Sequence, residues 1–157
     1  MDQQQYNSAL ASLQRSCVKR EHCRQEIYRK ALKAAGENIE TAQKMVEELV
    51  KDRFVDDARY AAAFAREKSS LSGWGRVKIS YTLRGKGISR EDIDAALQEV
   101  DEVAAGERLE KLLRSKWAVL REDPYGKFKL IKYALTRGYE YNDELTGLVE
   151  KIIKRMY

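Results

Sequence analysis

The stretch Ser72–Ser89, SGWGRVKISYTLRGKGIS, decides how the rest of the chain is interpreted. It has a pair of glycines near each end and four basic residues with no acid. Three interpretations are open: a phosphate-binding loop, a nucleic-acid-binding helix, or a basic helix with well-formed ends. A phosphate-binding loop would follow a strand and continue into Gly-Lys-Ser/Thr or a third glycine, and neither is present. Gly87 instead stands where a helix ends, with Leu83 and Ile88 as the contacting pair of a Schellman ending.

The same ending recurs along the chain. Gly36, Gly87 and Gly138 are spaced 51 residues apart, and each follows a stretch with the pattern of a helix. One matching glycine would be noise, but many matches at one offset predict a threefold repeat. Other pairs at this offset are Trp74 and Tyr125, Gly75 and Gly126, Lys78 and Lys129, and Lys86 and Arg137.

Each repeat is predicted to hold three helices. In the first repeat we place them near 7–18, 21–35 and 38–51. In the second, one helix opens at Asp56 or Asp57 with a buried stripe ending at Leu71, one spans 75–86, and one opens at Ser89 with apolar positions up to Ala104. In the third, a stripe runs over 109–120, Asp123-Pro124 starts the next helix, and Asn142 caps a helix whose core positions end at Met156.

The predicted fold class is therefore all-α. We expect three tandem three-helix repeats at 1–52, 53–103 and 104–157, stacked as one continuous array into an elongated, curved, solenoid-like rod. The 157 residues suffice for a core without a metal or disulfide.

Composition excludes several classes of function. The longest apolar run is Tyr60–Ala65, which is too short for a signal peptide or a membrane span, so we expect a cytoplasmic protein. Cys17 and Cys23 lie on different sides of a helix and are interpreted as reduced thiols rather than zinc ligands. The single histidine, His22, is expected to be exposed and has no nucleophile partner. We therefore predict no enzyme, no cofactor and no metal.

The charges are sorted by helix. The chain carries a net charge of +5, from 30 basic and 25 acidic side chains. Residues 68–90 contain six basic side chains and no acid, residues 124–139 contain four and no acid, and residues 91–102 contain six acids and no base. Acids near helix starts and bases near helix ends would explain single charges as ordinary solvated ones. An acid-free second helix that recurs in each repeat favours phosphate contact instead.

Base stacking is not expected from the sequence. Trp74 and Tyr125 stand at helix starts and are interpreted as packing residues, and no surface of interleaved aromatic side chains is evident. Any contact with nucleic acid should therefore be directed at the backbone and depend weakly on base sequence.

The segment 54–88 resembles the signature of the RecX family, bacterial regulators of the RecA recombinase. Two departures are Arg76, where the family often has proline, and Lys78, where arginine is common. The matching positions are Phe54, Asp56, Asp57, Arg59, Tyr60, Ala61, Phe64, Arg66, Gly73, Trp74, Gly75, Ile79, Leu83, Lys86, Gly87 and Ile88.

The resemblance implies a non-enzymatic regulator that acts by binding. RecX-like proteins associate with RecA filaments on single-stranded DNA, lie along the filament groove and restrain recombinase, ATPase and coprotease activities in DNA repair and recombination. The expected partners are thus the RecA filament and single-stranded DNA through its phosphates, with double-stranded DNA left open, no membrane, and a monomeric state. The alternatives are a stand-alone, sequence-nonspecific DNA-binding module and a helical protein-interaction scaffold.

The candidate contact residues for nucleic acid or filament are the cations of two second helices. Whether these cations would touch DNA or RecA is left open by the sequence. They are Arg76, Lys78, Arg84, Lys86, Lys127, Lys129, Lys132 and Arg137.

Overall fold

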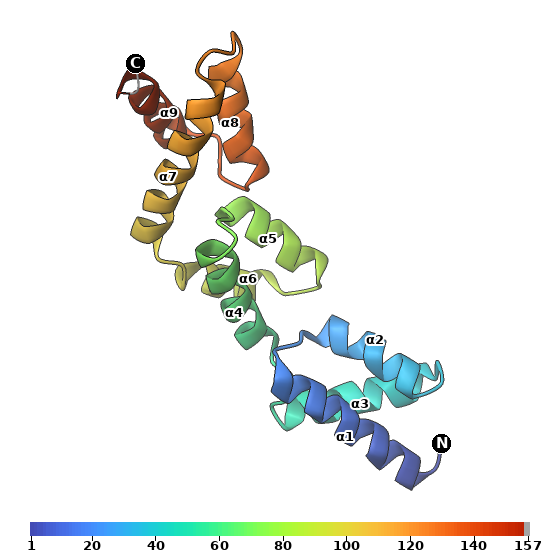
Figure 1. Cartoon of the computed structure of the whole chain (residues 1–157). Helices are drawn as coiled ribbons and strands as arrows, with labels where there is room; N and C mark the ends of the chain where they lie inside the picture. The colour runs from blue at the N-terminus through green and yellow to red at the C-terminus, as the bar shows by residue number, and fades with distance from the viewer. Residues whose placement is uncertain (156–157) are drawn as a thin grey trace. The chain divides into compact units, whose positions relative to one another are not determined.

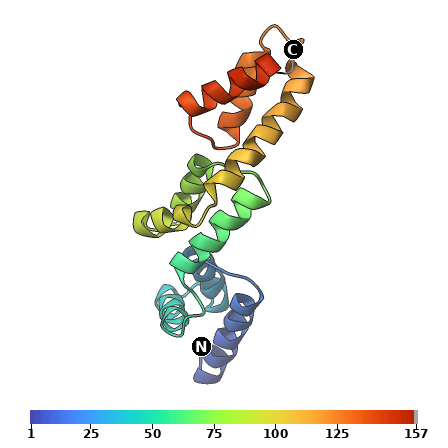
Figure 2. The same ribbon diagram turned by 90° about the vertical axis from the view of Figure 1, so that its left-hand side faces the viewer.

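The computed structural model describes residues 1–155, and within this range every regular element is an α-helix. The predicted all-α class is confirmed (Figure 1; Figure 2). The helices of this range are α1 (Gln3–Lys19), α2 (Arg24–Ala34), α3 (Ile39–Lys51), α4 (Asp57–Ser70), α5 (Arg76–Gly85), α6 (Arg90–Gln98), α7 (Glu102–Leu120), α8 (Gly126–Thr136) and α9 (Asp143–Arg155).

The chain divides into two compact units. Unit 1 comprises residues 1–63 and 83–96, and unit 2 comprises residues 64–82 and 97–157. Helices α4 and α5 each contribute residues to both units. The three repeat boundaries and the stacking into a rod stay predictions, and the expected core position Met156 lies outside the described residues.

The core of unit 1 is formed by one face of each of α1, α2 and α3. Ile27, Ala31, Ala42 and Met45 are fully buried there, and Leu13 from α1 packs against them. These positions recur every three or four residues along each helix, so each helix places its apolar stripe inward. The pattern on α3 is the clearest, because all four of its buried residues fall on one side.

The core of unit 2 contains the same arrangement in α7, α8 and α9. Leu113 and Trp117 of α7 meet Leu130 and Ala134 of α8, and Val149 of α9 is also fully buried. Figure 2 shows these three helices side by side within the unit. The predicted stripe over 109–120 is therefore confirmed at its most buried positions.

The repeating glycines end helices as predicted. Gly36, Gly87 and Gly138 have φ angles of 62°, 78° and 92°, which is left-handed backbone that glycine adopts without a Cβ penalty. After each glycine, the next residue's N–H bonds back to a carbonyl five residues earlier; for Ile88 the acceptor is Leu83 O at 3.2 Å. This is the outer bond of the Schellman motif, and it satisfies one of the carbonyls that a helix end leaves free.

Several local predictions need correction. Asp123-Pro124 does not start a helix: its Asp123 carboxylate accepts the N–H of Tyr125 at 2.8 Å and shapes a turn, so that α8 begins at Gly126. Ala104 belongs to α7 rather than to the preceding helix, because Asp101 caps α7 through the N–H of Ala104 at 3.1 Å. The cap at Asn142 is confirmed by its bond from Leu145 N at 2.9 Å.

Two predictions about burial are wrong. Leu71 follows the last residue of α4 and is 79% exposed, since the chain leaves the helix there and the stripe does not continue. His22 is 2% exposed rather than solvated. Its Nδ1 lies 3.0 Å from the carbonyl of Arg20, and burial, followed by the positive charge of Arg20, lowers the pKa of the imidazole.

Candidate nucleic-acid or filament interface

The start of α5 is fixed by the end of α8, within unit 2. Gly75 N donates to Arg137 O at 2.8 Å, and Val77 N donates to Gly138 O at 2.9 Å. The first N–H groups of a helix have no partner inside it, so these bonds satisfy donors that would otherwise need a cap. The approach is close: a Cβ added to Gly138 would lie 2.2 Å from the Cβ of Lys78. Two of the predicted site residues, Lys78 and Arg137, are thereby brought to the same junction.

At this junction the two cations lie over aromatic rings. Lys78 Nζ is 4.3 Å from the centroid of Trp74, and Lys68 Nζ is 4.9 Å from it. The Arg137 guanidinium is 5.1 Å from the centroid of Tyr133 and donates to Ser72 O at 3.2 Å. A cation over a ring gains about 0.5–1 kcal/mol at an exposed site. Lys78 and Arg137 therefore have structural partners within the unit.

Three further candidates form ion pairs. The pairs are Arg76 with Glu102 at 3.0 Å, Lys127 with Glu150 at 3.1 Å, and Lys129 with Asp123 at 2.5 Å. The bond from Lys129 and the bond from Tyr125 N lower the pKa of the Asp123 carboxyl. All three cations stay about half exposed, so an incoming phosphate would compete with a carboxylate for each of them.

Lys86 is attached to unit 1. Its Nζ is 3.6 Å from a Glu26 carboxylate oxygen and 5.8 Å from the centroid of the Tyr60 ring. Burial opposes its charge, but the Tyr60 hydroxyl and the Glu26 carboxylate outweigh burial and raise the pKa of Lys86. Lys86 thus supports the packing of α2 against the end of α5, in addition to any role in binding.

Arg84 and Lys132 are different from the other six candidates. Both are exposed, and in the described part of the chain neither makes an ion pair or a contact with a ring. A cation without a local carboxylate gives up least when a phosphate approaches. Of the eight predicted contact residues, these two have the least intramolecular competition.

The structure also reveals exposed aromatic side chains that the sequence interpretation missed. Tyr125 is 70% exposed and Phe128 is 80% exposed, so the packing role expected for Tyr125 is wrong. Trp74 does pack, edge to face on Phe64 with ring centroids 6.1 Å apart. The absence of an aromatic partner for the exposed rings could not be inferred from their spacing, because a helical stripe looks the same whether it is covered or open.

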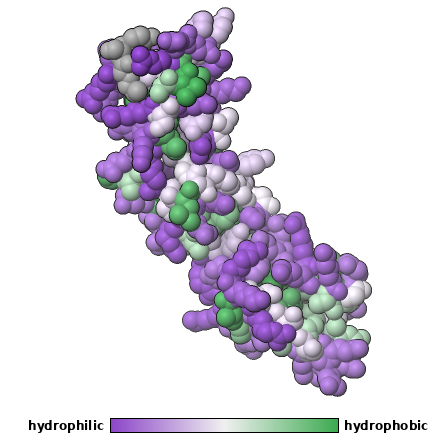
Figure 3. Space-filling view, viewed as in Figure 1, coloured by the Kyte–Doolittle hydropathy of each residue, from purple (hydrophilic) through white to green (hydrophobic). Residues whose placement is uncertain are grey.

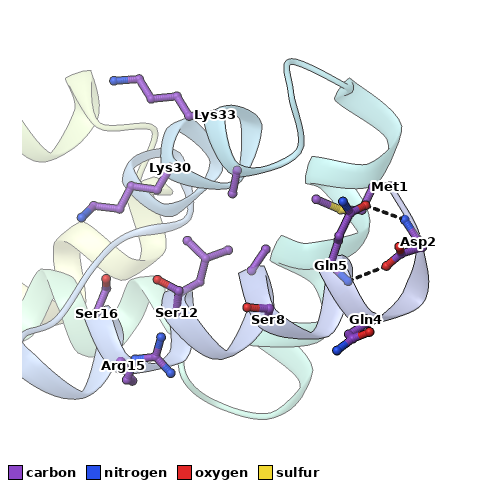
Figure 4. A pocket seen from close by; sticks show the side chains of 13 residues that line it. Met1, Asp2, Gln4, Gln5, Ser8, Ser12, Arg15, Ser16, Lys30 and Lys33 are labelled. Atoms are coloured by element: carbon purple, nitrogen blue, oxygen red, sulfur yellow. Dashed lines mark hydrogen bonds between the residues drawn. The ribbon is translucent and has the colours of Figure 1, made fainter.

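A second basic area lies on unit 1, between α1 and α2. An open groove of about 850 Å³ is lined by Ser8, Ser12 and Ser16 of α1, which are spaced one helical turn apart, and by Lys30 and Lys33 of α2. In Figure 4, Lys30 extends toward Ser16, whereas the amino group of Lys33 points away from α1. These lysines belong to the acid-free second helix of the first repeat, although they were not among the predicted contact residues.

The described residues show neither a membrane-crossing helix nor a metal centre. In residues 1–155 no helix combines the length and the apolar character needed to cross a bilayer. No group of three or more His, Cys, Asp and Glu side chains in that range is arranged to hold a metal ion. Cys17 and Cys23 are both buried free thiols, and burial raises the pKa of each.

Comparison with known proteins gives a consistent match. Residues 56–97 match the model of the second three-helix domain of RecX. The chain is 34% identical over 123 residues to the regulatory protein RecX of Pseudomonas putida, across 78% of this chain and 77% of that protein. It is 32% identical over 121 residues to the regulatory protein RecX of Prosthecochloris aestuarii, across 77% and 78% of the two chains.

Solved structures share the fold. A crystal structure of regulatory protein RecX superposes with a TM-score of 0.79 at 24% identity, over 96% of this chain and 72% of the other. RecX from Lactobacillus salivarius superposes with a TM-score of 0.75 at 18% identity, over 98% and 97%. The fold agreement and the sequence identity to the two relatives together confirm the resemblance seen in residues 54–88: the chain belongs to the RecX family of regulatory proteins.

Proposed function

We propose that this protein binds RecA filaments formed on single-stranded DNA and restrains the recombinase, ATPase and coprotease activities of RecA. Membership of the RecX family carries the proposal, since the resemblance in residues 54–88 implies RecA as the partner. We further propose that it acts as a monomer in the bacterial cytoplasm, during DNA repair and recombination. The relatives are named regulatory proteins, which agrees with a role in binding rather than catalysis.

The basic second helices supply a physical means of binding. Each phosphate that a lysine or arginine neutralises releases condensed counterions, which favours association at low salt. Arg84 and Lys132 are the strongest candidates, because neither has an intramolecular carboxylate partner in the described chain. Arg76, Lys127 and Lys129 would first have to exchange their carboxylates for phosphate, so we expect each of them to contribute less.

The test is a RecA ATPase and strand-exchange assay on single-stranded DNA, with and without this protein. The double charge reversal Arg84→Glu/Lys132→Glu should weaken inhibition, and the helical content should stay unchanged because both side chains are exposed. Lys51→Glu/Lys111→Glu is the matched control: it changes the net charge equally, at exposed positions outside the second helices. Inhibition by the first variant at the wild-type level would reject these contact residues.

Binding to naked DNA separates the alternatives. If four to six phosphates are contacted on single strands, log affinity should fall with log salt at a slope of about −3 to −4, and each lost contact should reduce that slope by about 0.7. Tight DNA binding with no effect on RecA would favour the stand-alone DNA-binding module. A chain that binds neither DNA nor RecA would favour the protein-interaction scaffold and overturn the proposal.

A further inference from the structure

We propose that the outward face of α8, formed by Tyr125, Phe128, Lys132 and Leu135, binds single-stranded nucleic acid by stacking unpaired bases on its two aromatic rings. Lys132 would neutralise an adjacent phosphate. The inference refines the proposed function by naming one contact surface, which lies entirely within unit 2. It differs from the sequence-based expectation, in which contact was confined to the nucleic-acid backbone.

The four residues share one side of the helix. The buried side of α8 is marked by Gly126, Leu130 and Ala134. Phe128, Lys132 and Leu135 are spaced by four and three residues, so they project together on the opposite side. Tyr125, at the N-cap, is three residues before Phe128 and extends the same row. Side chains at this spacing have Cβ atoms roughly 5–6 Å apart, so the two rings are close enough to serve one strand.

These rings are open, unlike the other large rings of unit 2. Trp74 is covered by Phe64 and two lysines, and Tyr133 contacts Lys116 and Arg137. In residues 1–155, neither Tyr125 nor Phe128 has a ring or cation contact, and they are 70% and 80% exposed. Figure 3 shows a mostly hydrophilic surface with isolated hydrophobic areas, one of them over the C-terminal helices. An exposed phenylalanine beside an exposed tyrosine and leucine is the kind of patch that marks a binding surface.

The charge around the rings favours nucleic acid over a protein partner. Residues 124–139 carry four cations and no acid. Lys132 lies between Phe128 and Leu135 in the row and has no ion-pair partner in the described chain. Lysine is depleted at the core of protein–protein interfaces, whereas a positively charged track with open aromatic rings is the usual composition of a single-strand site. A duplex would not present its base faces to these rings, so the site should select unpaired strands.

The experiment measures binding of the full-length chain to an oligothymidylate and to a duplex of equal length. Phe128→Ala should lower affinity for the single strand by about 5- to 100-fold, which is the range for loss of one stacked base, and should leave duplex binding unchanged. Lys132→Glu should weaken both. Tyr141→Ala is the matched control, because Tyr141 is a comparably exposed aromatic residue (65%) of the same unit outside α8.

Phe128→Trp provides a second readout that does not depend on the alanine variant. Its added fluorescence should be quenched on titration with the oligothymidylate and not with the duplex, because only an unpaired base can stack on the indole. Quenching by the single strand alone supports the inference. The result that overturns it is a Phe128→Ala protein with wild-type affinity for the single strand, or equal quenching by both ligands.

The RecA assay distinguishes failure of this inference from failure of the proposed function. If Phe128→Ala binds the single strand normally but no longer inhibits the RecA ATPase, the α8 face contacts protein: the inference is overturned and the proposed function stands. If the wild-type chain binds no single strand yet inhibits RecA, the inference is again overturned alone. If the wild-type chain neither binds nor inhibits, both are overturned.

Discussion

Replacing Gly138 with alanine should destabilise unit 2 through two separable terms. The first is conformational: Gly138 has φ of 92°, and a non-glycine residue in left-handed backbone costs about 1–2 kcal/mol. The second is steric: the added Cβ would lie 2.2 Å from Lys78 Cβ and 2.7 Å from Lys78 N. Overpacking of this kind costs about 1–3 kcal/mol. The free energy of unfolding should therefore fall by about 2–5 kcal/mol.

Two matched glycines separate these terms. Gly36 has φ of 62° and nothing within 4 Å of an added Cβ, so Gly36→Ala should show only the conformational cost of about 1–2 kcal/mol. Gly106 lies inside α7 with open space around it, so Gly106→Ala should stabilise the chain by about 0.5–1 kcal/mol.

The assay is urea unfolding followed by circular dichroism for all three variants. Tryptophan fluorescence provides a second signal for unit 2, because Trp74 and Trp117 both belong to that unit. If Gly138→Ala costs no more than Gly36→Ala, the close approach of α8 to the start of α5 does not stabilise the protein and the reasoning fails.

Two further predictions concern local contacts. Burial and Arg20 lower the pKa of His22, so the unfolded chain binds more protons below the ordinary value of 6.5; this part of the stability is complete above that pH and is lost as pH falls through the folded pKa. Urea unfolding at about pH 8 and about pH 5 should therefore show a smaller pH effect in His22→Gln than in the wild type, and an equal effect would contradict the burial of His22. Asn142→Ala removes the cap bond from Leu145 N and should cost about 1 kcal/mol, whereas Asn142→Asp keeps an acceptor and should cost less. Thermal unfolding followed by Trp117 fluorescence checks the cap, and equal losses in the two variants would count against it.

The candidate site was only partly predictable. The acid-free second helices pointed to the correct class of side chain, but not to which cations remain available. Lys127 and Lys132 look equivalent along the chain, yet only Lys127 has a carboxylate, Glu150 of α9, within 3.1 Å. The partner is 23 residues away, so its position depends on how α8 and α9 pack. Phe128 was likewise invisible as a surface residue, because periodicity identifies a side of a helix without showing what covers it.

What the sequence by itself determined was the helices, the 51-residue repeat of their glycine endings and the family. These features depend on neighbours along the chain: a cap accepts an N–H three residues on, and a left-handed glycine closes a bond across six residues. Only the tertiary structure decided which cations are paired, that His22 is buried, and that the rings of Tyr125 and Phe128 are open to solvent. Burial and ion pairing are set by side chains from helices distant in sequence, whose positions follow from packing rather than from local order.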